Sequence, residues 1–196
     1  KLIVINGQTL AFEIEQPFKG SINTSPIAAD FTNRNLFDIL VCTDKGIVSL
    51  FDPRKKKILW TWTSKAGIEN TPSVGDNYED GTRSLVIDDV DGNLYYLKIN
   101  EKGTNLQWTQ SLNISITTSP VLEDFNQDKV LDVTVGCSDG KIYVLDGRSG
   151  KVLNKFEIPS KSRVASTPAV GDINRDGIPE IIIGGEDHRI YAFSEN

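Results

Sequence analysis

The strongest constraint on this chain is an internal repeat of 46 to 48 residues. A proline that follows two small polar residues occurs four times, with spacings of 46, 48 and 48, at Pro26, Pro72, Pro120 and Pro168. Four residues after each proline stands an aspartate: Asp30, Asp76, Asp124 and Asp172. Because a fixed period of this length indicates a stack of supersecondary units, one repeat is expected to form one unit.

Each repeat is predicted to form β-strands. In the last repeat, a short apolar run at 168–170, a β-branched run at 180–184 and an alternating run at 189–193 are separated by turn residues, and 151–158 supplies a fourth strand in the third repeat. Four antiparallel strands in such a unit are typical of a β-propeller blade. We therefore predict an all-β propeller fold, with second strands near 38–43, 85–89, 131–136 and 180–184.

The repeat also assigns the strands at both ends. The segment 1–7 matches 141–147 position for position, so the first strand corresponds to the third strand of a blade, and the last repeat stops after its third strand. The chain is therefore expected to be one propeller segment that belongs to a longer propeller or pairs with further blades or a second copy. The blade repeats are predicted at 1–20 (partial), 21–66, 67–114, 115–162 and 163–196 (partial).

Composition excludes several partners. The net charge of −6 argues against nucleic acid, which requires clustered Lys and Arg. No apolar run approaches 18 residues, so direct membrane insertion is not expected. The sequence contains no Met and no signal peptide, and is expected to be a mature or excised segment. Cys42 and Cys137 lie in non-neighbouring repeats and are not expected to form a disulfide.

A nine-residue loop after the first strand of the last repeat carries the most specific chemistry. Oxygen side chains occupy positions one, three, five and nine, position six is Gly177, and position seven can offer a backbone carbonyl. Calcium prefers six to eight oxygen ligands, and glycine permits the sharp turn. A calcium site is therefore predicted at Asp172, Asn174, Asp176, the Ile178 carbonyl and Glu180.

The third repeat places a similar loop in the same slot, with Lys129 where the last loop has glycine. Asp, Asn and Gly also favour ordinary surface turns, which is the alternative interpretation of one such loop. Recurrence at the same point of the repeat favours calcium. A second calcium site is therefore predicted at Asp124, Asn126, Asp128, the Val130 carbonyl and Asp132.

The other two repeats depart from this pattern. The second repeat has Tyr78 and Ser84 at positions three and nine, so it is expected to bind calcium poorly, although Glu79 could contribute. The first repeat keeps Asp30 and Asp38 but has Arg34 at position five. Because a guanidinium suits carboxylates, Arg34 is predicted to replace the ion and to bridge Asp30 or Asp38; the alternative is that Arg34 points into solvent and the loop is metal-free.

The segment 167–185 resembles the FG-GAP, or VCBS, repeat family, whose blades occur in integrin α-chain propellers and many bacterial surface proteins. The resemblance implies calcium at the nine-residue loops and ligand binding at the opposite face. The segment 142–153 is similar to quinoprotein-like (PQQ-like) blades, which serve both quinone-dependent dehydrogenases and non-enzymatic scaffolds. The Trp usual near the end of that pattern is Phe156 here.

Two classes of function remain open at this point. The first is a non-catalytic, calcium-binding module for a protein or carbohydrate ligand, in adhesion or as the sensor domain of a membrane-anchored receptor, which is secreted, periplasmic or at the cell surface. Its ligand loops would be 19–23, 64–70, 111–117 and 160–165. The second is part of an enzyme propeller, either a quinone-dependent dehydrogenase or a calcium-using polysaccharide lyase. His188, the single histidine, occupies the glycine slot of a turn, which does not favour acid–base catalysis.

Overall fold

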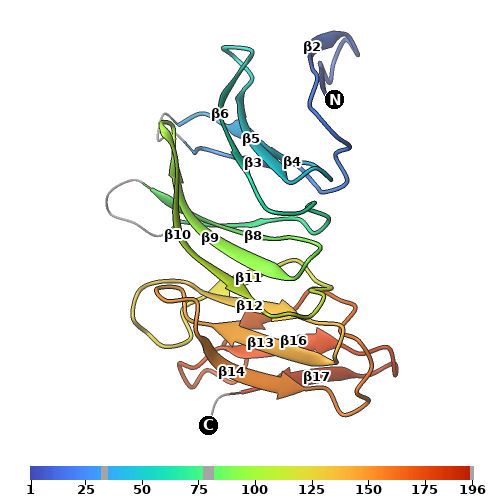
Figure 1. Ribbon diagram of the computed structural model, residues 1–196, viewed down its shortest axis with the longest axis vertical. Coiled ribbons are helices and arrows are strands. Elements are labelled where there is room, and N and C mark those ends of the chain that lie inside the picture. Colours follow the sequence, from blue (N-terminus) through green and yellow to red (C-terminus); the bar gives the residue numbers. More distant parts are fainter. Residues whose placement is uncertain (32–34, 77–81, 195–196) are drawn as a thin grey trace.

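The chain forms a row of antiparallel sheets (Figure 1). The computed structural model describes residues 1–31, 35–76 and 82–194, and in these ranges the regular structure is all β. The N-terminal hairpin consists of β1 (Leu2–Ile5) and β2 (Phe12–Gln16). The first four-stranded sheet consists of β3 (Ile27–Ala29), β4 (Asp38–Cys42), β5 (Ile47–Asp52) and β6 (Lys57–Thr63).

Two more four-stranded sheets and one three-stranded sheet follow. The second sheet contains β7 (Ser73–Asp76), β8 (Arg83–Asp88), β9 (Asn93–Asn100) and β10 (Gly103–Ser111). The third contains β11 (Val121–Glu123), β12 (Asp132–Gly136), β13 (Lys141–Leu145) and β14 (Val152–Glu157). The last contains β15 (Ala169–Gly171), β16 (Glu180–Gly184) and β17 (Ile190–Phe193).

These sheets confirm the predicted strands. The second strands β4, β8, β12 and β16 lie where the β-branched runs were expected, and each sheet falls within one predicted repeat. Within every sheet, consecutive strands are hydrogen-bonded neighbours, as in a blade. Within the described residues, no helix is long and apolar enough to cross a bilayer.

The apolar core is divided among the spaces between neighbouring sheets. One cluster joins the first two four-stranded sheets, a second joins the second and third, and a third joins the third to the last sheet. Every residue of β12 is buried, because the strand has a sheet on each side. Sheet-on-sheet packing therefore supplies the hydrophobic stabilisation of each blade.

Aromatic residues of the fourth strands pack between blades. Trp62 contacts Tyr95 of the next sheet with ring centroids 5.0 Å apart, and Phe156 contacts Phe193 at 5.2 Å. The indole of Trp60 donates to the Asn100 carbonyl of the next sheet at 2.9 Å. These contacts bind each blade to the next.

The indole of Trp108 makes the same contact as that of Trp60, donating to the Gly147 carbonyl of the next sheet at 2.8 Å. A spacing of 46 residues relates Trp108 to Trp62 in the sequence, yet strand register relates it to Trp60, because Trp60 pairs with Leu50 and Trp108 with Tyr96. The β9–β10 hairpin is two residues longer than a simple period implies.

The N-terminal hairpin repeats the geometry of β13–β14. Leu2 pairs with Gln16 as Ile142 pairs with Phe156, and both pairs of strands have a register shift at the same position, between Val4 and Ile5 in the first hairpin. This confirms that β1 corresponds to a third strand. In Figure 1 the hairpin stands beside the first four-stranded sheet and away from the rest of the row.

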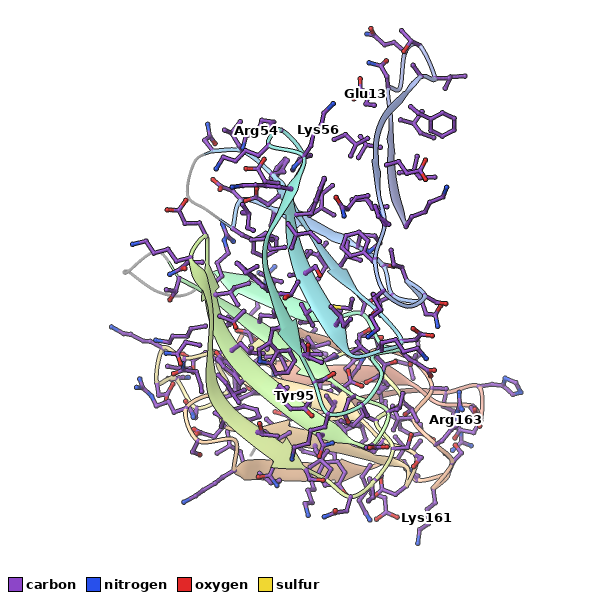
Figure 2. The ribbon with its side chains drawn as sticks, turned by 45° about the horizontal axis from the view of Figure 1, so that its top comes forward. Glu13, Arg54, Lys56, Tyr95, Lys161 and Arg163 are labelled. Atoms are coloured by element: carbon purple, nitrogen blue, oxygen red, sulfur yellow. The ribbon has the colours of Figure 1, made fainter. Side chains whose placement is uncertain are left out.

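Strand order divides the loops between two ends of the molecule. In an antiparallel sheet, first-to-second and third-to-fourth connections lie at one end, while second-to-third turns and the connections to the next sheet lie at the other. The nine-residue loops therefore share an end with hairpin tips such as Arg54–Lys56. Arg163 and Lys161 lie at the opposite end, and Figure 2 shows them far from Arg54 and Lys56.

Candidate calcium site

The nine-residue loops share a backbone conformation, although they do not share the residue types that favour it. Position six has positive φ in each loop where it is described: 57° at Asn35, 68° at Lys129 and 87° at Gly177. Position four is also left-handed, at Gln127 and Arg175. Since glycine adopts this conformation without steric cost, Gly177 suits its place better than Lys129 does.

In the last loop, four predicted ligands turn toward the loop interior. Asp172 Oδ1 and Asn174 Oδ1 both accept the backbone N–H of Asp176, at 3.1 and 2.9 Å. Asp172 Oδ2 accepts the N–H of Gly177 at 2.9 Å, and Glu180 Oε2 accepts the N–H of Ile173 at 2.9 Å. Short bonds from acids to backbone N–H groups thus hold positions one and nine in place.

One group of the last loop lies between two carboxylates. The side-chain amide nitrogen of Asn174 is 2.8 Å from Asp176 Oδ2 and 3.1 Å from Glu180 Oε1. Both carboxylates therefore have an oxygen within bonding distance of one point. Ile178 lies two residues after Asp176, and its N–H donates to Asp176 Oδ1 at 2.8 Å.

The third-repeat loop reproduces the first part of this arrangement. Asp124 Oδ1 and Asn126 Oδ1 both accept the N–H of Asp128 at 3.0 Å. Asp124 Oδ2 accepts the N–H of Lys129 at 2.8 Å, and Asp128 Oδ1 accepts that of Val130 at 2.8 Å. Positions one, three and five are thus arranged alike in both loops.

The third-repeat loop differs in the groups that surround it. Arg148, from the tip of the β13–β14 hairpin, donates from Nε to Asp128 Oδ2 at 2.5 Å and from Nη2 to the Asp128 carbonyl at 2.8 Å. The side-chain amide of Asn126 donates to Asp146 Oδ2 of the same hairpin at 3.1 Å. A guanidinium therefore already neutralises one predicted calcium ligand. Sequence analysis of the loop alone missed Arg148.

Asp132, the closing acid of this loop, is fully buried and bonded to backbone on both oxygens. Its Oδ2 accepts from Phe125 and Asn126 at 3.0 and 3.3 Å, and its Oδ1 accepts from Gly147 at 2.8 Å. Burial raises the pKa of Asp132 to about 6, although the three N–H groups act in the opposite direction. Asp132 thus anchors the loop to the neighbouring hairpin.

The donor chemistry fits calcium better in the last loop than in the third-repeat loop. Among the described residues, no three His, Cys, Asp or Glu side chains gather closely enough to form a metal cluster alone. Any ion would therefore need the Asn side chain and the position-seven carbonyl as well. In the last loop Asp172, Asp176 and Glu180 would supply the charge, with Asn174 and Ile178 completing the oxygen donors.

The predictions for the first two repeats fall partly outside the described residues. Arg34 lies there, as do Tyr78, Glu79 and Asp80 of the second repeat, so the predicted Arg34 bridge and the weak second-repeat site stay predictions. In the described part of the first loop, the N–H of Asn35 donates to Asp30 Oδ2 at 2.6 Å.

Three other residues behave as predicted. His188 has a φ of 65° and occupies the turn between β16 and β17. Cys42 and Cys137 are both buried and free of a disulfide. Burial, as the main cause, raises the pKa of each thiol to about 12, which keeps these cysteines protonated and unreactive.

A pocket of about 270 Å³ lies at the end opposite the nine-residue loops. Three of the four connections predicted to bind ligands line part of it, together with the end of β8. Its lining consists of Glu69, Asn70, Asp88, Val90, Ser115, Ile116, Thr117 and Arg163. Asp88 was missed from sequence, although its slot in the repeat could have revealed it, since the other repeats have Cys42, Gly136 and Gly184 there.

Comparison with known proteins agrees with this architecture. Residues 124–183, which include both predicted calcium loops, match the model of the FG-GAP-like repeat. No curated protein matches the sequence.

Solved structures with similar folds include the computationally designed Ika4 protein, with a TM-score of 0.68 and 14% identity over 92% of this chain and 95% of that one. BamB from Moraxella catarrhalis has a TM-score of 0.68 at 14% identity, covering 97% of this chain and 55% of BamB. The Cps50 (Swd1) β-propeller domain of Myceliophteria thermophila has a TM-score of 0.60 at 14% identity, covering 81% of this chain and 50% of that one. The chain thus spans about half the length of these natural structures.

The family match confirms the resemblance stated above, and the structural neighbours confirm the fold. The chain is built of β-propeller blades, and its segment 124–183 matches the FG-GAP-like repeat.

Proposed function

We propose that this chain is a calcium-binding, non-catalytic propeller module that binds a protein or carbohydrate ligand outside the cytoplasm. The observation that carries the proposal is the loop at 172–180, in which three acids and Asn174 turn their polar groups toward one interior. The same slot of the third repeat has a matching arrangement. Calcium would complete the oxygen cluster that each loop begins.

Other features support a location outside the cytoplasm. Calcium sites of modest affinity can fill where calcium is abundant, as it is in extracellular settings. The two cysteines are buried with raised pKa values, so an oxidising environment would leave them unchanged. The pocket lies on connections between blades, and variable connections on a rigid scaffold are where binding residues concentrate.

Thermal unfolding with calcium and with EGTA tests the metal site. Metal that binds only the folded chain stabilises it by about 2.7 kcal/mol at a hundredfold excess over Kd. We expect calcium to raise the midpoint of the wild-type chain. The double variant Asp172→Asn/Asp176→Asn should lose the part of this rise that the last loop contributes.

Asp91→Asn is the matched control, because it removes an exposed carboxylate from a turn at the opposite end. It should keep the full response to calcium. An identical midpoint in calcium and EGTA for the wild-type chain would overturn the proposal.

A further inference from the structure

Asp88 is a carboxylate in a position where the other blades have none. It ends β8 and pairs with Leu94, in the register in which Cys42 pairs with Val48 and Gly136 with Ile142. The side chain of Asp88 is 3% exposed. A buried carboxylate is costly unless it is paired, so its presence here calls for a partner.

The partner that the chain supplies satisfies only one oxygen. Asn70 donates from its side-chain amide to Asp88 Oδ2 at 2.7 Å, while Asp88 Oδ1 is buried and has no donor among the described residues. In the neighbouring blade, Thr118 instead accepts the N–H of Gly136 at 2.9 Å. The Asn70–Asp88 pair therefore replaces a neutral hydroxyl contact and leaves one acceptor unused.

The unused acceptor belongs to a residue that lines the 270 Å³ pocket. Glu69 adds a second acid at the exposed rim, and the charge of Arg163 is balanced by Glu186, whose Oε1 is 3.5 Å from Arg163 Nε. Burial, as the largest effect, raises the pKa of Asp88 to about 7, with nearby Asp89 adding to the rise. The inner end of the pocket thus favours a cation that can donate hydrogen bonds.

We propose that the Asp88 pocket binds an alkylammonium group, which donates to the Asp88 carboxylate while its carbon chain lies toward Ile116 and Val90. This inference rests on the proposed binding role and names its ligand chemistry. An ammonium supplies three donors and a full positive charge, the complement of a half-paired carboxylate. The volume suits a chain of a few carbon atoms or a lysine side chain.

Binding of n-butylammonium chloride to the 196-residue chain tests the proposal, followed by the shift of the Asn70 side-chain amide in ¹H–¹⁵N spectra. We expect saturable binding, with n-butanol and tetramethylammonium at least tenfold weaker, since one lacks the charge and the other lacks donors. Binding of n-butanol as tight as that of n-butylammonium would overturn the proposal, as would no saturable binding of the amine.

Variants separate the carboxylate from the fold. Asp88→Asn should weaken n-butylammonium binding at least tenfold, and Asp88→Gly, the residue found at 136 and 184, should do the same in a folded blade. Asp91→Asn, on the same turn but exposed, should bind like the wild-type chain. Unchanged binding by folded Asp88→Asn or Asp88→Gly would refute the assignment.

A second probe identifies the source of the amine. Nα-acetyl-lysine N-methylamide that binds as tightly as n-butylammonium supports a lysine side chain of a protein partner. Binding of n-butylammonium alone supports a small free amine. Each titration is run in calcium and in EGTA, beside the thermal unfolding test of the calcium site. A chain that calcium does not stabilise contradicts the proposed function, whereas a chain that does not bind the amine contradicts only this inference.

Discussion

The loops at 124–132 and 172–180 have the same polar pattern and nearly the same backbone, yet they differ in what holds their acids. In the last loop, Asp176 and Glu180 are bridged by Asn174 of the same loop. In the third-repeat loop, Asp128 is held by Arg148 and Asp132 by the N–H of Gly147, both from the next hairpin. Among the described residues, the same motif is therefore held within its own loop in one repeat and by a neighbouring hairpin in the other.

The largest expected effect is on folding stability, when the acids at position nine of the two loops, Asp132 and Glu180, are replaced. Asp132→Ala leaves three backbone N–H groups without their acceptor, at Phe125, Asn126 and Gly147, and should lower the free energy of unfolding by about 3 kcal/mol or more. Glu180→Ala removes one backbone bond, to Ile173, and should cost about 1 kcal/mol. Urea unfolding in EGTA measures both without a contribution from metal.

Equal losses of unfolding free energy for Asp132→Ala and Glu180→Ala would show that the two loops are anchored alike, which would contradict the difference between them described above. Asp132→Asn serves as the control, because it keeps one acceptor oxygen in nearly the same shape. It should fall between the wild-type chain and Asp132→Ala.

We expect Arg148 to lower the calcium affinity of the third-repeat loop relative to that of the last loop. Because its guanidinium occupies Asp128 Oδ2, Arg148→Ala should free that oxygen and raise the affinity of the third-repeat loop about tenfold. Stability without calcium should fall by less than about 1 kcal/mol, since the pair is exposed. Isothermal titration with calcium, in a chain whose last loop carries Asp172→Asn/Asp176→Asn, isolates this site.

Lys161→Ala is the matched control for Arg148→Ala, because it removes an exposed cation paired with Glu157 at the opposite end. It should leave calcium affinity unchanged. A third-repeat loop that binds calcium no better after Arg148→Ala would mean that the guanidinium does not compete with the ion.

The smallest expected effect comes from position six. Lys129→Gly should relieve the cost of a φ of 68° and raise stability by up to about 1 kcal/mol, while Gly177→Lys should lower it by a similar amount. Thermal midpoints in EGTA measure both. Opposite signs with similar size would show that the two loops share one backbone requirement; a loss in both variants would show that the Lys129 side chain has its own role.

The repeat predicts the blades well because each of its recurring features depends on neighbouring residues alone: a strand start, a turn or a β-branched run. It also places the predicted ligand residues at equivalent positions of both loops, because they belong to the same local pattern. The contacts of Arg148 and Gly147 could not be predicted in this way, because they join residues 15 to 20 positions apart that the β13–β14 hairpin brings together. The equivalence of Trp60 and Trp108 could not be predicted either, because the two extra residues in the β9–β10 hairpin change their spacing in the sequence. Strand register shows that they are equivalent.

The division of the apolar core among the spaces between sheets determines how the molecule can open. Each cluster joins only two neighbouring sheets, so loss of one cluster separates two parts of the row while the others stay packed. Amide protons of β8 and β12, which have a sheet on either side, should then exchange with solvent more slowly than those of β17. Unfolding can begin at an outer sheet and advance one blade at a time, so partly open forms with several intact blades can be populated.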